Sequence, residues 1–538
     1  MKYYHSCRRT LPLLLVGAVL TALTLIYPQI GLLEWLTMIP LCAGAYRLCA
    51  DDSCTLRRAY GYGFFTVYVF YFVIYHWFVN LYPLDFVDMS NEASAVVIAA
   101  GWLGLPILQA AVGGLIFLVF RLMHRTGIFS RAPLLRPFAF AALWVIFEWS
   151  ATLSWAGVPW GRLCLGQIEM LPILQSASLF GSYFVSFLIV LVNGLFAYAV
   201  LYGRRETLCG VLAVSVFGTN ILFGIVAGLL PKEATETVRV AVIQGNMDSH
   251  EKWGSDAYYI TAERYGDLTR QAAADGAELV LWPETAIPYD LGYENYKRDF
   301  VCDLARECGV TLIVGAFRYE NTGNYYNALF LVEPDGTFHE EFYAKRHLVP
   351  FGEYVPMREV IMTLIPPLAE LSALDNDVTP GEGTMLFDTA WGKLGSLICF
   401  DSIYEQLTLE SVRDGANLMM ISSNDSWFYD SAAVYQHQAQ AQLRAIESGR
   451  YFVRAANTGI STVISPTGEL LAWIDPLTRG YAVADVEMQT DDTLYTVTGN
   501  LFVYLCLAFV ILLPIVGKLV GKPRKTVVTL RSYYGKRR

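Results

Sequence analysis

Long apolar runs alternate along the chain with one extended stretch of a different pattern. A helix of about 20 apolar residues crosses the roughly 30 Å hydrocarbon core of a bilayer. Seven such runs predict a transmembrane domain over residues 1–232, and an eighth begins the segment 498–538, which ends in a basic tail. The eight runs are 11–26, 31–50, 60–82, 94–122, 133–154, 176–202, 208–230 and 498–517. The sequence therefore predicts a bundle of eight transmembrane helices.

Two of these apolar runs contain a glutamate, Glu34 and Glu148. An ionisable group inside a membrane span is often functional. Neither glutamate has a basic partner at helical spacing in its own run. We therefore expect both to lie near the ends of their spans and to reach interfacial water.

Residues 233–497 replace the long apolar runs with short strands and amphipathic helices. Short runs rich in β-branched residues predict strands, and apolar residues three and four apart predict helices. The predicted strands are 239–244, 279–282, 311–316, 328–332, 394–399, 418–422 and 461–464, and the predicted helices are 257–274, 294–308, 404–414 and 431–449. This pattern predicts one α/β domain with a core of its own.

Charge is divided unevenly between the two parts. Residues 233–492 hold 40 of the 49 acidic and 17 of the 39 basic residues, a net charge of −23, whereas the remainder carries +13. The Lys and Arg residues of the short loops fall on one side of the predicted spans, which is the cytoplasmic side of a membrane protein. We therefore expect cytoplasmic termini, a periplasmic α/β domain and a bacterial inner membrane. The acidic charge argues against a nucleic-acid partner.

The ten cysteines form no CxxC pair and no spacing typical of a metal site, so we expect neither a metal nor a cofactor. Three other segments carry candidate chemistry. Glu284 follows a buried strand, where desolvation would raise the pKa of its carboxyl toward that of a general base. Lys345 lies in an unusually apolar stretch. Cys399 ends an apolar strand, where helix amides and a cation would stabilise a thiolate.

Each of these residues also has an ordinary interpretation. A free cysteine in an apolar strand is usually a small core residue, and a single Lys or Glu is usually a surface charge. However, all three candidates lie at strand ends, where α/β sheets build their sites. Together they supply a nucleophile, a base and an oxyanion stabiliser.

The segments around these residues resemble the nitrilase superfamily, with Glu284 in WPET, Lys345 in YAKRHLVPFGEYVP and Cys399 in GSLICFD. The eight apolar runs make the sequence more similar to one membrane-embedded branch, the apolipoprotein N-acyltransferases of bacterial inner membranes. Further matching stretches are VIQGN at 242–246, YNALFLV at 326–332, SNDSWFYDS at 423–431, QHQAQAQLRAIESGR at 436–450, RAANTGIS at 454–461, GVPWG at 157–161 and SLFGSYFVSF at 178–187.

The resemblance implies an αββα sandwich and a two-step acyl transfer without metal or cofactor. A phospholipid, usually phosphatidylethanolamine, would acylate Cys399. The α-amine of a diacylglyceryl-modified apolipoprotein would then accept the chain. Glu284 would act as the base and Lys345 as the oxyanion stabiliser.

The resemblance also implies that Glu353 supports the site and that Trp253 and Asn327 handle substrate. The sequence departs from the family pattern after the nucleophile, where Phe400 and Asp401 replace the usual Tyr-Glu. Any role of these two positions in orienting substrate is therefore transferred less directly than the triad.

Two other functions are compatible with parts of the sequence. A membrane-anchored nitrilase-type amidase would use the same three residues on a small amide, and its active site would not need an apolar entrance. A non-catalytic lipid-binding scaffold is disfavoured by the intact Glu284, Lys345 and Cys399. Residues 355–374 have helical apolar spacing directly after Glu353, which predicts a lid or an interfacial arm.

Overall fold

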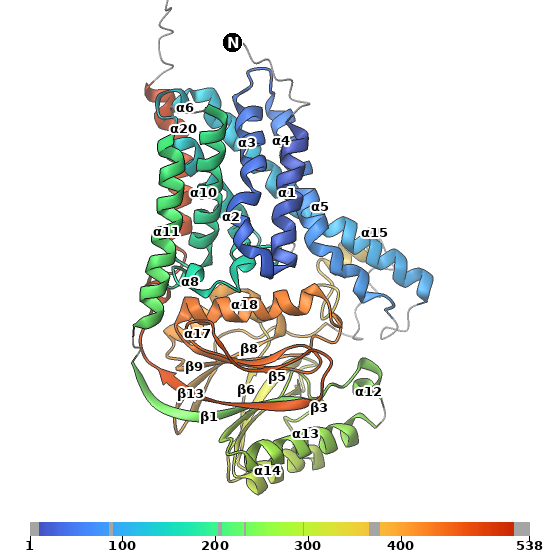
Figure 1. Ribbon diagram of the computed structural model, residues 1–538. Coiled ribbons are helices and arrows are strands. Elements are labelled where there is room, and N and C mark those ends of the chain that lie inside the picture. Colours follow the sequence, from blue (N-terminus) through green and yellow to red (C-terminus); the bar gives the residue numbers. More distant parts are fainter. Residues whose placement is uncertain are drawn as a thin grey trace, which may run out of the picture.

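The computed structural model describes residues 10–84, 90–155, 157–202, 207–230, 233–254, 256–293, 295–364 and 377–520. Apolar helices form a bundle at one end, and the strands form a separate domain beneath it (Figure 1). The bundle helices are α1 (Leu11–Ile26), α2 (Glu34–Thr37), α3 (Ile39–Ala50), α4 (Leu56–Ile74), α5 (Asn91–Thr126), α6 (Ile128–Arg131), α7 (Leu135–Ser150), α8 (Leu171–Leu174), α9 (Ala177–Phe180), α10 (Ser182–Tyr202), α11 (Thr207–Leu229) and α20 (Leu501–Val520).

All eight predicted apolar runs form helix, but not all form a full span. Among the described residues, five helical segments are long and apolar enough to cross a membrane: Leu56–Leu81, Asn91–Thr126, Ser182–Tyr202, Thr207–Leu229 and Leu501–Val520. Helices α1 and α7 have 16 residues each. The second run is broken into the 3-10 helix Pro28–Leu33, α2 and the 12-residue α3. An N-terminal region of several apolar helices is confirmed, whereas the count of eight spans is not.

The expectation that Glu34 and Glu148 reach water is wrong. Both side chains are buried. The side-chain amide of Gln167 donates to Glu34 at 2.6 Å, and the backbone N–H of Leu163 and the indole of Trp144 donate to Glu148 at 3.0 Å. The 3-10 helix Leu163–Gln167 therefore supplies hydrogen-bond donors to carboxyl groups inside the bundle.

Two β-sheets stack face to face in the second domain. The first has the strand order β13-β1-β2-β4-β5-β6, with β3 paired to β4, and the second has the order β12-β11-β10-β9-β8-β7. Their bounds are β1 (Ala234–Gln244), β2 (Leu279–Leu281), β3 (Ile287–Asp290), β4 (Thr311–Tyr319), β5 (Tyr325–Val332), β6 (Phe338–Ala344), β7 (Leu386–Thr389), β8 (Gly392–Ile398), β9 (Leu418–Ser423), β10 (Tyr451–Ala456), β11 (Ser461–Ile464), β12 (Leu470–Ile474) and β13 (Gly480–Gln489).

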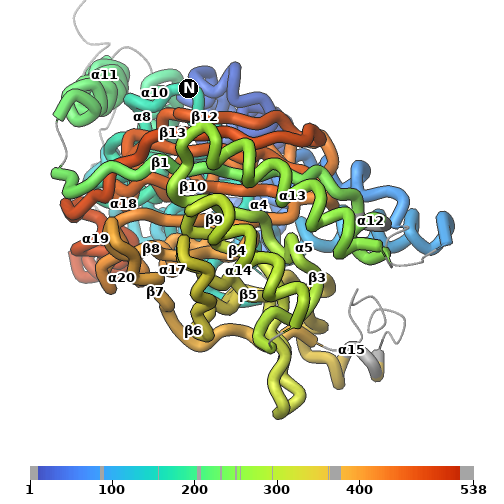
Figure 2. Tube along the Cα trace, turned by 90° about the horizontal axis from the view of Figure 1, so that it is seen from below, coloured from blue at the N-terminus to red at the C-terminus, as the bar shows by residue number. Residues whose placement is uncertain are grey.

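Helices cover the outer face of each sheet. Figures 1 and 2 show α13 (Ala257–Ala274) and α14 (Tyr296–Cys308) on the side away from the bundle. Helices α17 (Glu405–Arg413) and α18 (Ala432–Ser448) lie between the second sheet and the bundle. The remaining helices are α12 (Ser249–Trp253), α15 (Arg358–Leu364) and α19 (Leu494–Thr498). The four layers form the αββα sandwich that the resemblance implied.

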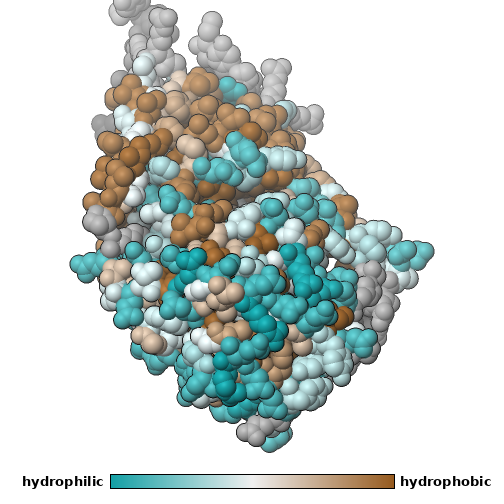
Figure 3. Space-filling model, turned by 60° about the horizontal axis from the view of Figure 1, so that its bottom comes forward, coloured by the Kyte–Doolittle hydropathy of each residue, from teal (hydrophilic) through white to brown (hydrophobic). Residues whose placement is uncertain are grey.

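The alternation of side chains along β1 shows how the sequence specifies these layers. Val238, Val240 and Val242 enter the core between the two sheets, whereas Ala241 and Ile243 pack with the helices on the outer face. Successive residues of a strand point to opposite faces, so a strand buried on both sides is continuously apolar. On the face shown in Figure 3, the bundle is mostly hydrophobic and the sandwich mostly hydrophilic.

Helix α18 joins the sandwich to the bundle, and 15 of its 17 residues are buried. Its end takes part in a buried ionic cluster with the start of α17. The guanidinium of Arg162 donates to Glu405 at 2.5 Å, and the hydroxyl of Tyr183 donates to the same carboxylate at 2.7 Å. Arg444 lies 2.9 Å from Glu447 and 3.5 Å from Glu405. The bundle and the sandwich therefore share a charged interface.

We expect Glu405→Gln to destabilise this interface strongly. Burial acts to raise the pKa of Glu405, but Arg162 and then Arg444 outweigh it and hold the pKa at about 2. The stabilisation from this charge is therefore present above the ordinary glutamate range and is lost as the pH falls toward 2. Breaking a buried ion pair costs about 3 to 5 kcal/mol.

The midpoint of thermal unfolding measures this effect. Glu307→Gln removes one member of an exposed pair with Arg270 and is the matched control, with an expected effect below about 1 kcal/mol. Equal midpoints for the two variants would contradict the role of Glu405.

Candidate active site

Three strand ends bring the predicted triad to one edge of the sandwich. Glu284 follows β2, Lys345 follows β6, and Cys399 follows β8. Strands β2 and β4 are parallel, and β5 and β6 continue the sheet antiparallel, so the start of β5 adjoins the end of β6. Gly315 of β4 permits the close approach of the Glu284 loop, since a Cβ there would lie 2.2 Å from the carbonyl oxygen of Pro283.

Lys345 is the buried centre of this site, with a side chain that is 2% exposed. Its ammonium group lies 2.9 Å from a carboxylate oxygen of Glu284 and 2.9 Å from one of Glu353. Burial acts to lower the pKa of Lys345, but Glu284 and Glu353 outweigh it and raise the pKa above its ordinary value. Lys345 is therefore held as a cation beside the other triad residues.

Asn327 and Glu353 complete the hydrogen bonding around that cation. The side-chain amide of Asn327 donates to Glu284 at 2.7 Å and to Glu353 at 3.1 Å. The backbone N–H of Val349 donates to the second oxygen of Glu353 at 2.9 Å. Both residues therefore contact the triad. The supporting role of Glu353 and the substrate-handling role of Asn327 stay predictions.

The pKa of Glu284 is opposite to the sequence expectation. Burial acts to raise the pKa of its carboxyl, but the ammonium of Lys345, and after it that of Lys252, outweigh burial and hold the pKa below its usual range. The expected upward shift is wrong because the expectation rested on burial alone. The charge of Lys345 outweighs burial, and the contact with Lys252 was not expected. Glu284 is therefore ionised at neutral pH and available to accept a proton.

Cys399 begins a short 3-10 helix (Cys399–Ile403) in a left-handed backbone conformation, with φ of 48°. A non-glycine residue adopts this conformation only where the surroundings enforce it. Burial, followed by the charge of Glu284, raises the pKa of the Cys399 thiol. The expectation of a resting thiolate is therefore wrong, and the thiol needs a base to become a nucleophile.

Asp401 fastens the loop of Lys345 to the 3-10 helix of Cys399. Its buried carboxylate accepts from the backbone N–H of His347 at 2.7 Å, from that of Ile398 at 3.1 Å and from the hydroxyl of Tyr343 at 2.9 Å. Burial raises its pKa to about 6, against those hydrogen bonds. Asp401 thus holds the backbone N–H groups of His347 and Ile398 in place. A glutamate at this position would place its carboxylate one methylene farther from its own backbone.

A cavity of about 530 Å³ lies next to the residue that follows Cys399, although none of Glu284, Lys345 and Cys399 lines it. Phe400, the residue after Cys399, lines it together with Arg346, His347 and Tyr404 of the sandwich. The opposite wall is the segment 152–155, which follows helix α7 of the bundle. The cavity therefore lies between the two domains.

Trp253 lies at the end of α12, with a half-exposed side chain and its ring 6.1 Å from that of Phe317. Its neighbour Lys252 was missed by the sequence analysis. The buried ammonium of Lys252 donates to the backbone carbonyl of Glu284 at 3.0 Å, and burial lowers its pKa to about 8. A single lysine in a polar segment gives no sequence signal for this position.

Half of the predicted lid, residues 365–374, lies beyond the described residues. Arg358–Leu364 forms α15, and Met357 and Val360 are exposed. Residues 365–376 lie outside the described ranges. The lid therefore stays a prediction.

His437 and Asp425 form a second polar cluster that the sequence analysis missed. The thiol of Cys399, one carboxylate oxygen of Asp425 and one ring nitrogen of His437 lie within 4.8 Å of one another. The Asp425 carboxylate already accepts from Ser423 at 2.8 Å and from Arg454 at 2.6 Å. Its oxygens are therefore occupied by hydrogen bonds and an ion pair. Asp425 and His437 lie in the matching stretches SNDSWFYDS and QHQAQAQLRAIESGR, but nothing in their spacing links them to Cys399.

Several known proteins are similar to this chain. It is 32% identical over 511 residues to the apolipoprotein N-acyltransferase of Geobacter metallireducens, covering 93% of this chain and 94% of that protein. It is 32% identical over 506 residues to that of Gloeobacter violaceus, covering 93% and 92%. Nit3 of Saccharomyces cerevisiae, a nitrilase-superfamily structure, shares 18% identity and covers 49% of this chain and 94% of that chain, with a TM-score of 0.39.

A sandwich with Glu284, Lys345 and Cys399 at one edge, joined to apolar helices, defines a membrane-associated thiol enzyme of the nitrilase type. The family model for carbon-nitrogen hydrolases matches residues 239–493, and that for the N-terminal domain of apolipoprotein N-acyltransferase matches residues 17–195. The chain belongs to the apolipoprotein N-acyltransferases, within the nitrilase superfamily.

The pKa values of the two acidic site residues predict a particular pH dependence. Because the pKa of Glu284 lies below its ordinary value of about 4.5, the base stays ionised as the pH falls through 6. We expect any loss of Cys399 acylation near pH 6 to come from protonation of Asp401, whose pKa is about 6. Asp401→Asn removes that titration, so its residual acylation rate should stay level until Glu284 is protonated.

Single-turnover acylation measured from about pH 4 to 7.5 tests this assignment. An acid limb at pH 6 to 7 that persists in Asp401→Asn would contradict it, because the base would then have a raised pKa.

Proposed function

We propose that this acyltransferase moves a fatty acyl chain from a phospholipid, through a thioester on Cys399, to the α-amine of a diacylglyceryl-modified apolipoprotein. Membership of the apolipoprotein N-acyltransferases supports lipoprotein N-acylation. One observation carries the assignment of residues. Lys345 contacts both Glu284 and Glu353 at the edge of the sandwich where β8 ends and Cys399 follows. The reaction proceeds in two steps at that edge.

In the first step, Glu284 takes the proton of the Cys399 thiol while the sulfur attacks the ester carbonyl carbon of the donor lipid. Lys345 stabilises the oxyanion of the tetrahedral intermediate. When the intermediate collapses, the carbon–oxygen bond of the ester breaks. Glu284 then returns the proton to the departing alcohol, which leaves as a lysophospholipid.

In the second step, the α-amine of the apolipoprotein attacks the thioester carbonyl. Glu284 accepts the proton that the amine loses, and Lys345 again stabilises the oxyanion. The carbon–sulfur bond breaks, and the sulfur regains a proton from Glu284. The products are an amide-linked acyl chain on the lipoprotein and a free Cys399.

Supporting residues hold these groups in place. Glu353 and Asn327 fix the positions of Lys345 and Glu284 through the hydrogen bonds described above. Asp401 holds the backbone before Cys399 and that of the Lys345 loop, and Phe400 shapes the cavity wall. We also assign substrate handling to Trp253 and Asn327, as the resemblance implies.

The interdomain cavity is the site we assign to the donor, with phosphatidylethanolamine as the expected phospholipid. Its bundle wall contains Leu153, which is 60% exposed, and Trp155, which is 40% exposed. Arg346 and His347 on the opposite wall provide polar contacts for a head group. The exposed apolar side chains of the segment that follows α7 suit a lipid better than a small soluble amide.

We place the protein in a bacterial inner membrane with both termini in the cytoplasm. All eight apolar runs cross the membrane in this proposal, with residues 1–232 as the membrane domain, 233–497 as the periplasmic domain and 498–538 as the last span and tail. The distribution of Lys and Arg in the short loops supports this topology. The short helices α1, α3 and α7 require a locally thinned bilayer.

The proposed function is tested with the purified protein in phosphatidylethanolamine vesicles and a diacylglyceryl-cysteine peptide. We expect an N-acylated peptide and an equal amount of lysophospholipid. Release of ammonia from a small amide, with no acyl transfer, would favour the amidase. Binding of lipid without either product would favour the scaffold.

A further inference from the structure

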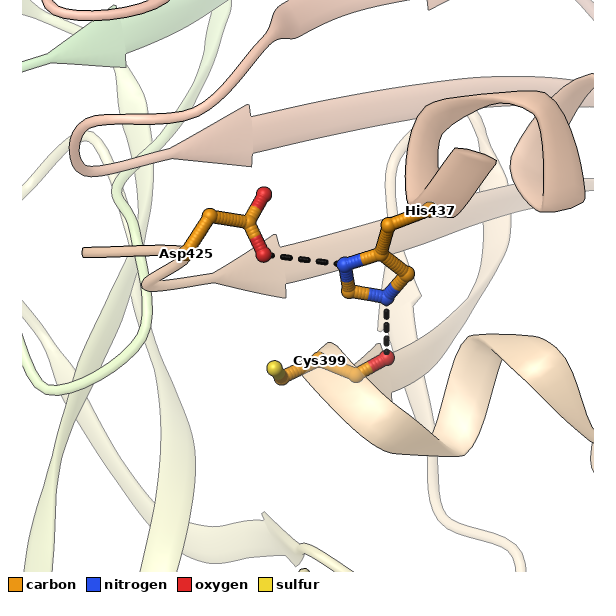
Figure 4. Close-up of side chains that lie close together, drawn as sticks. All are labelled: Cys399, Asp425 and His437. Carbon is orange, nitrogen blue, oxygen red and sulfur yellow. Dashed lines mark hydrogen bonds and ion pairs between the residues drawn. The ribbon is translucent and has the colours of Figure 1, made fainter. Parts of the chain in front are cut away.

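The backbone carbonyl of Cys399 is held by two side chains. The hydroxyl of Ser402 donates to it at 2.7 Å. The Nε2 atom of His437 lies 3.2 Å from the same oxygen (Figure 4). Nε2 also lies 3.1 Å from the Ser402 hydroxyl, and Nδ1 lies 3.2 Å from the guanidinium of Arg454. In the tautomer with the proton on Nε2, Nδ1 can accept from Arg454 and Nε2 donates to the carbonyl oxygen, which can only accept. The nucleophile is thus fastened through its main chain to helix α18, which carries His437.

His437 is itself anchored by a buried network. Its Nδ1 atom lies 2.9 Å from a carboxylate oxygen of Asp425, and the other oxygen of Asp425 accepts from Arg454 at 2.6 Å. All three side chains are at most 2% exposed. Gly459 leaves room for the carboxylate, because a Cβ at that position would lie 2.3 Å from it. The imidazole therefore has a fixed orientation.

Neither nitrogen of this imidazole is free for a direct chemical role. Nε2 is engaged with the carbonyl of Cys399 and Nδ1 with Asp425, so both ring nitrogens have partners. In Figure 4 the sulfur of Cys399 points away from the ring. His437 therefore acts on the backbone of the nucleophile, whereas Glu284 remains the base.

The bundle packs against the other side of the same histidine. The ring of Trp160, in the loop before the 3-10 helix Leu163–Gln167, lies 5.7 Å from the imidazole. The indole N–H of Trp160 donates to the side chain of Gln436 at 2.6 Å, and Gln440 donates to the carbonyl of Pro159 at 3.1 Å. The loop is thus docked on α18 on both sides of its contact with His437.

We propose that His437, oriented by Asp425 and packed by Trp160 of the bundle, is a positioning residue that holds the Cys399 backbone in its left-handed conformation. The inference rests on the proposed function only in taking Cys399 as the nucleophile. It adds that the membrane bundle takes part in the geometry of the nucleophile as well as in lipid access.

The strained backbone explains why this hold matters. A left-handed conformation at a non-glycine residue relaxes unless its neighbours enforce it. Loss of the His437 hydrogen bond would let the Cys399 peptide rotate and would displace the sulfur relative to Glu284 and Lys345. Misplacement of a reacting atom by about 1 Å costs on the order of 100-fold in rate.

The test compares His437→Leu, His437→Gln and a control, Gln438→Leu, in the full-length protein in phosphatidylethanolamine vesicles. Gln438 is a buried neighbour on the same helix, and its amide donates to Gln442 at 3.0 Å rather than to the site. We expect His437→Leu to slow single-turnover acylation of Cys399 on the order of 100-fold. The apparent KM for lipid and the unfolding midpoint should match those of the control.

His437→Gln should recover at least about tenfold of that loss, because a side-chain amide can donate to the carbonyl in place of Nε2. If His437→Leu fails to fold, Ser402→Ala removes the other donor to the same oxygen and should slow acylation without changing KM.

Acylation at the control rate in His437→Leu, or a loss in both His437 variants that only follows the unfolding midpoint, would overturn the positioning role. If Ser402→Ala has to be measured in place of His437→Leu, acylation at the rate of the unmodified protein would also overturn the positioning role. If the unmodified protein forms no acyl adduct on Cys399, the proposed function fails instead, so the two failures are distinguishable.

Discussion

Replacing Cys399 with alanine or serine is expected to abolish acyl transfer while the protein still inserts and folds. The thioester requires the sulfur, and the half-buried side chain changes by little in volume. A serine hydroxyl has a far higher pKa than a thiol, so Glu284 could not ionise it at neutral pH. The measurement is N-acylation of a diacylglyceryl-cysteine peptide, with thermal unfolding as the check of folding.

Cys302 and Cys308 provide matched controls for this prediction. Both lie on α14, on the side of the sandwich away from the bundle, and burial raises the pKa of each thiol. Their replacement by alanine should leave transfer unchanged. Activity that survives in Cys399→Ala but disappears in either control would show that the nucleophile is wrongly assigned.

Lys345→Met is expected to lower Cys399 acylation by about 10³-fold or more, a larger loss than for Glu284→Gln. The lysine lies between the carboxylates of Glu284 and Glu353. Its removal takes away the oxyanion partner and also raises the pKa of the base, since two buried carboxylates then face each other. Single-turnover acylation and the unfolding midpoint are the two measurements.

A double variant separates these effects. Lys345→Met with Glu353→Gln removes the repulsion that the single variant creates, so it should regain thermal stability. It should not regain acylation, because the oxyanion partner is still missing. Recovery of acylation in the double variant would show that Lys345 has only a structural role.

The sequence was sufficient to predict how the sandwich places its chemistry. Short apolar runs followed by polar residues predicted the strand ends at Glu284, Lys345 and Cys399. Parallel strands bring such ends to one edge of a sheet. The bundle was predictable as a set of apolar runs, whereas the break in its second run was missed. Its signal was present, because Pro40 lies in that run and Pro28 lies three residues before it, and proline removes a backbone donor from a helix.

Features that depend on contacts between distant segments could not be predicted. The lowered pKa of Glu284 comes from Lys252 and Lys345, which are 32 and 61 residues away in the chain. Burial of Glu34 and Glu148 depends on a loop that folds back into the bundle. The polar residues of α18 read as a solvated helix face, yet the bundle covers them. Such contacts produce no periodic pattern of apolar and polar residues in the local sequence.

The central claim is that Cys399 carries the acyl chain between the two substrates. Mass spectrometry of peptides from the protein, after incubation with phosphatidylethanolamine and without acceptor, tests it most directly. The account predicts a thioester-linked acyl group on the peptide that contains Cys399, removed by hydroxylamine and by the diacylglyceryl-cysteine peptide. An acyl group on any other residue that is passed to the acceptor, with Cys399 unmodified, would contradict it.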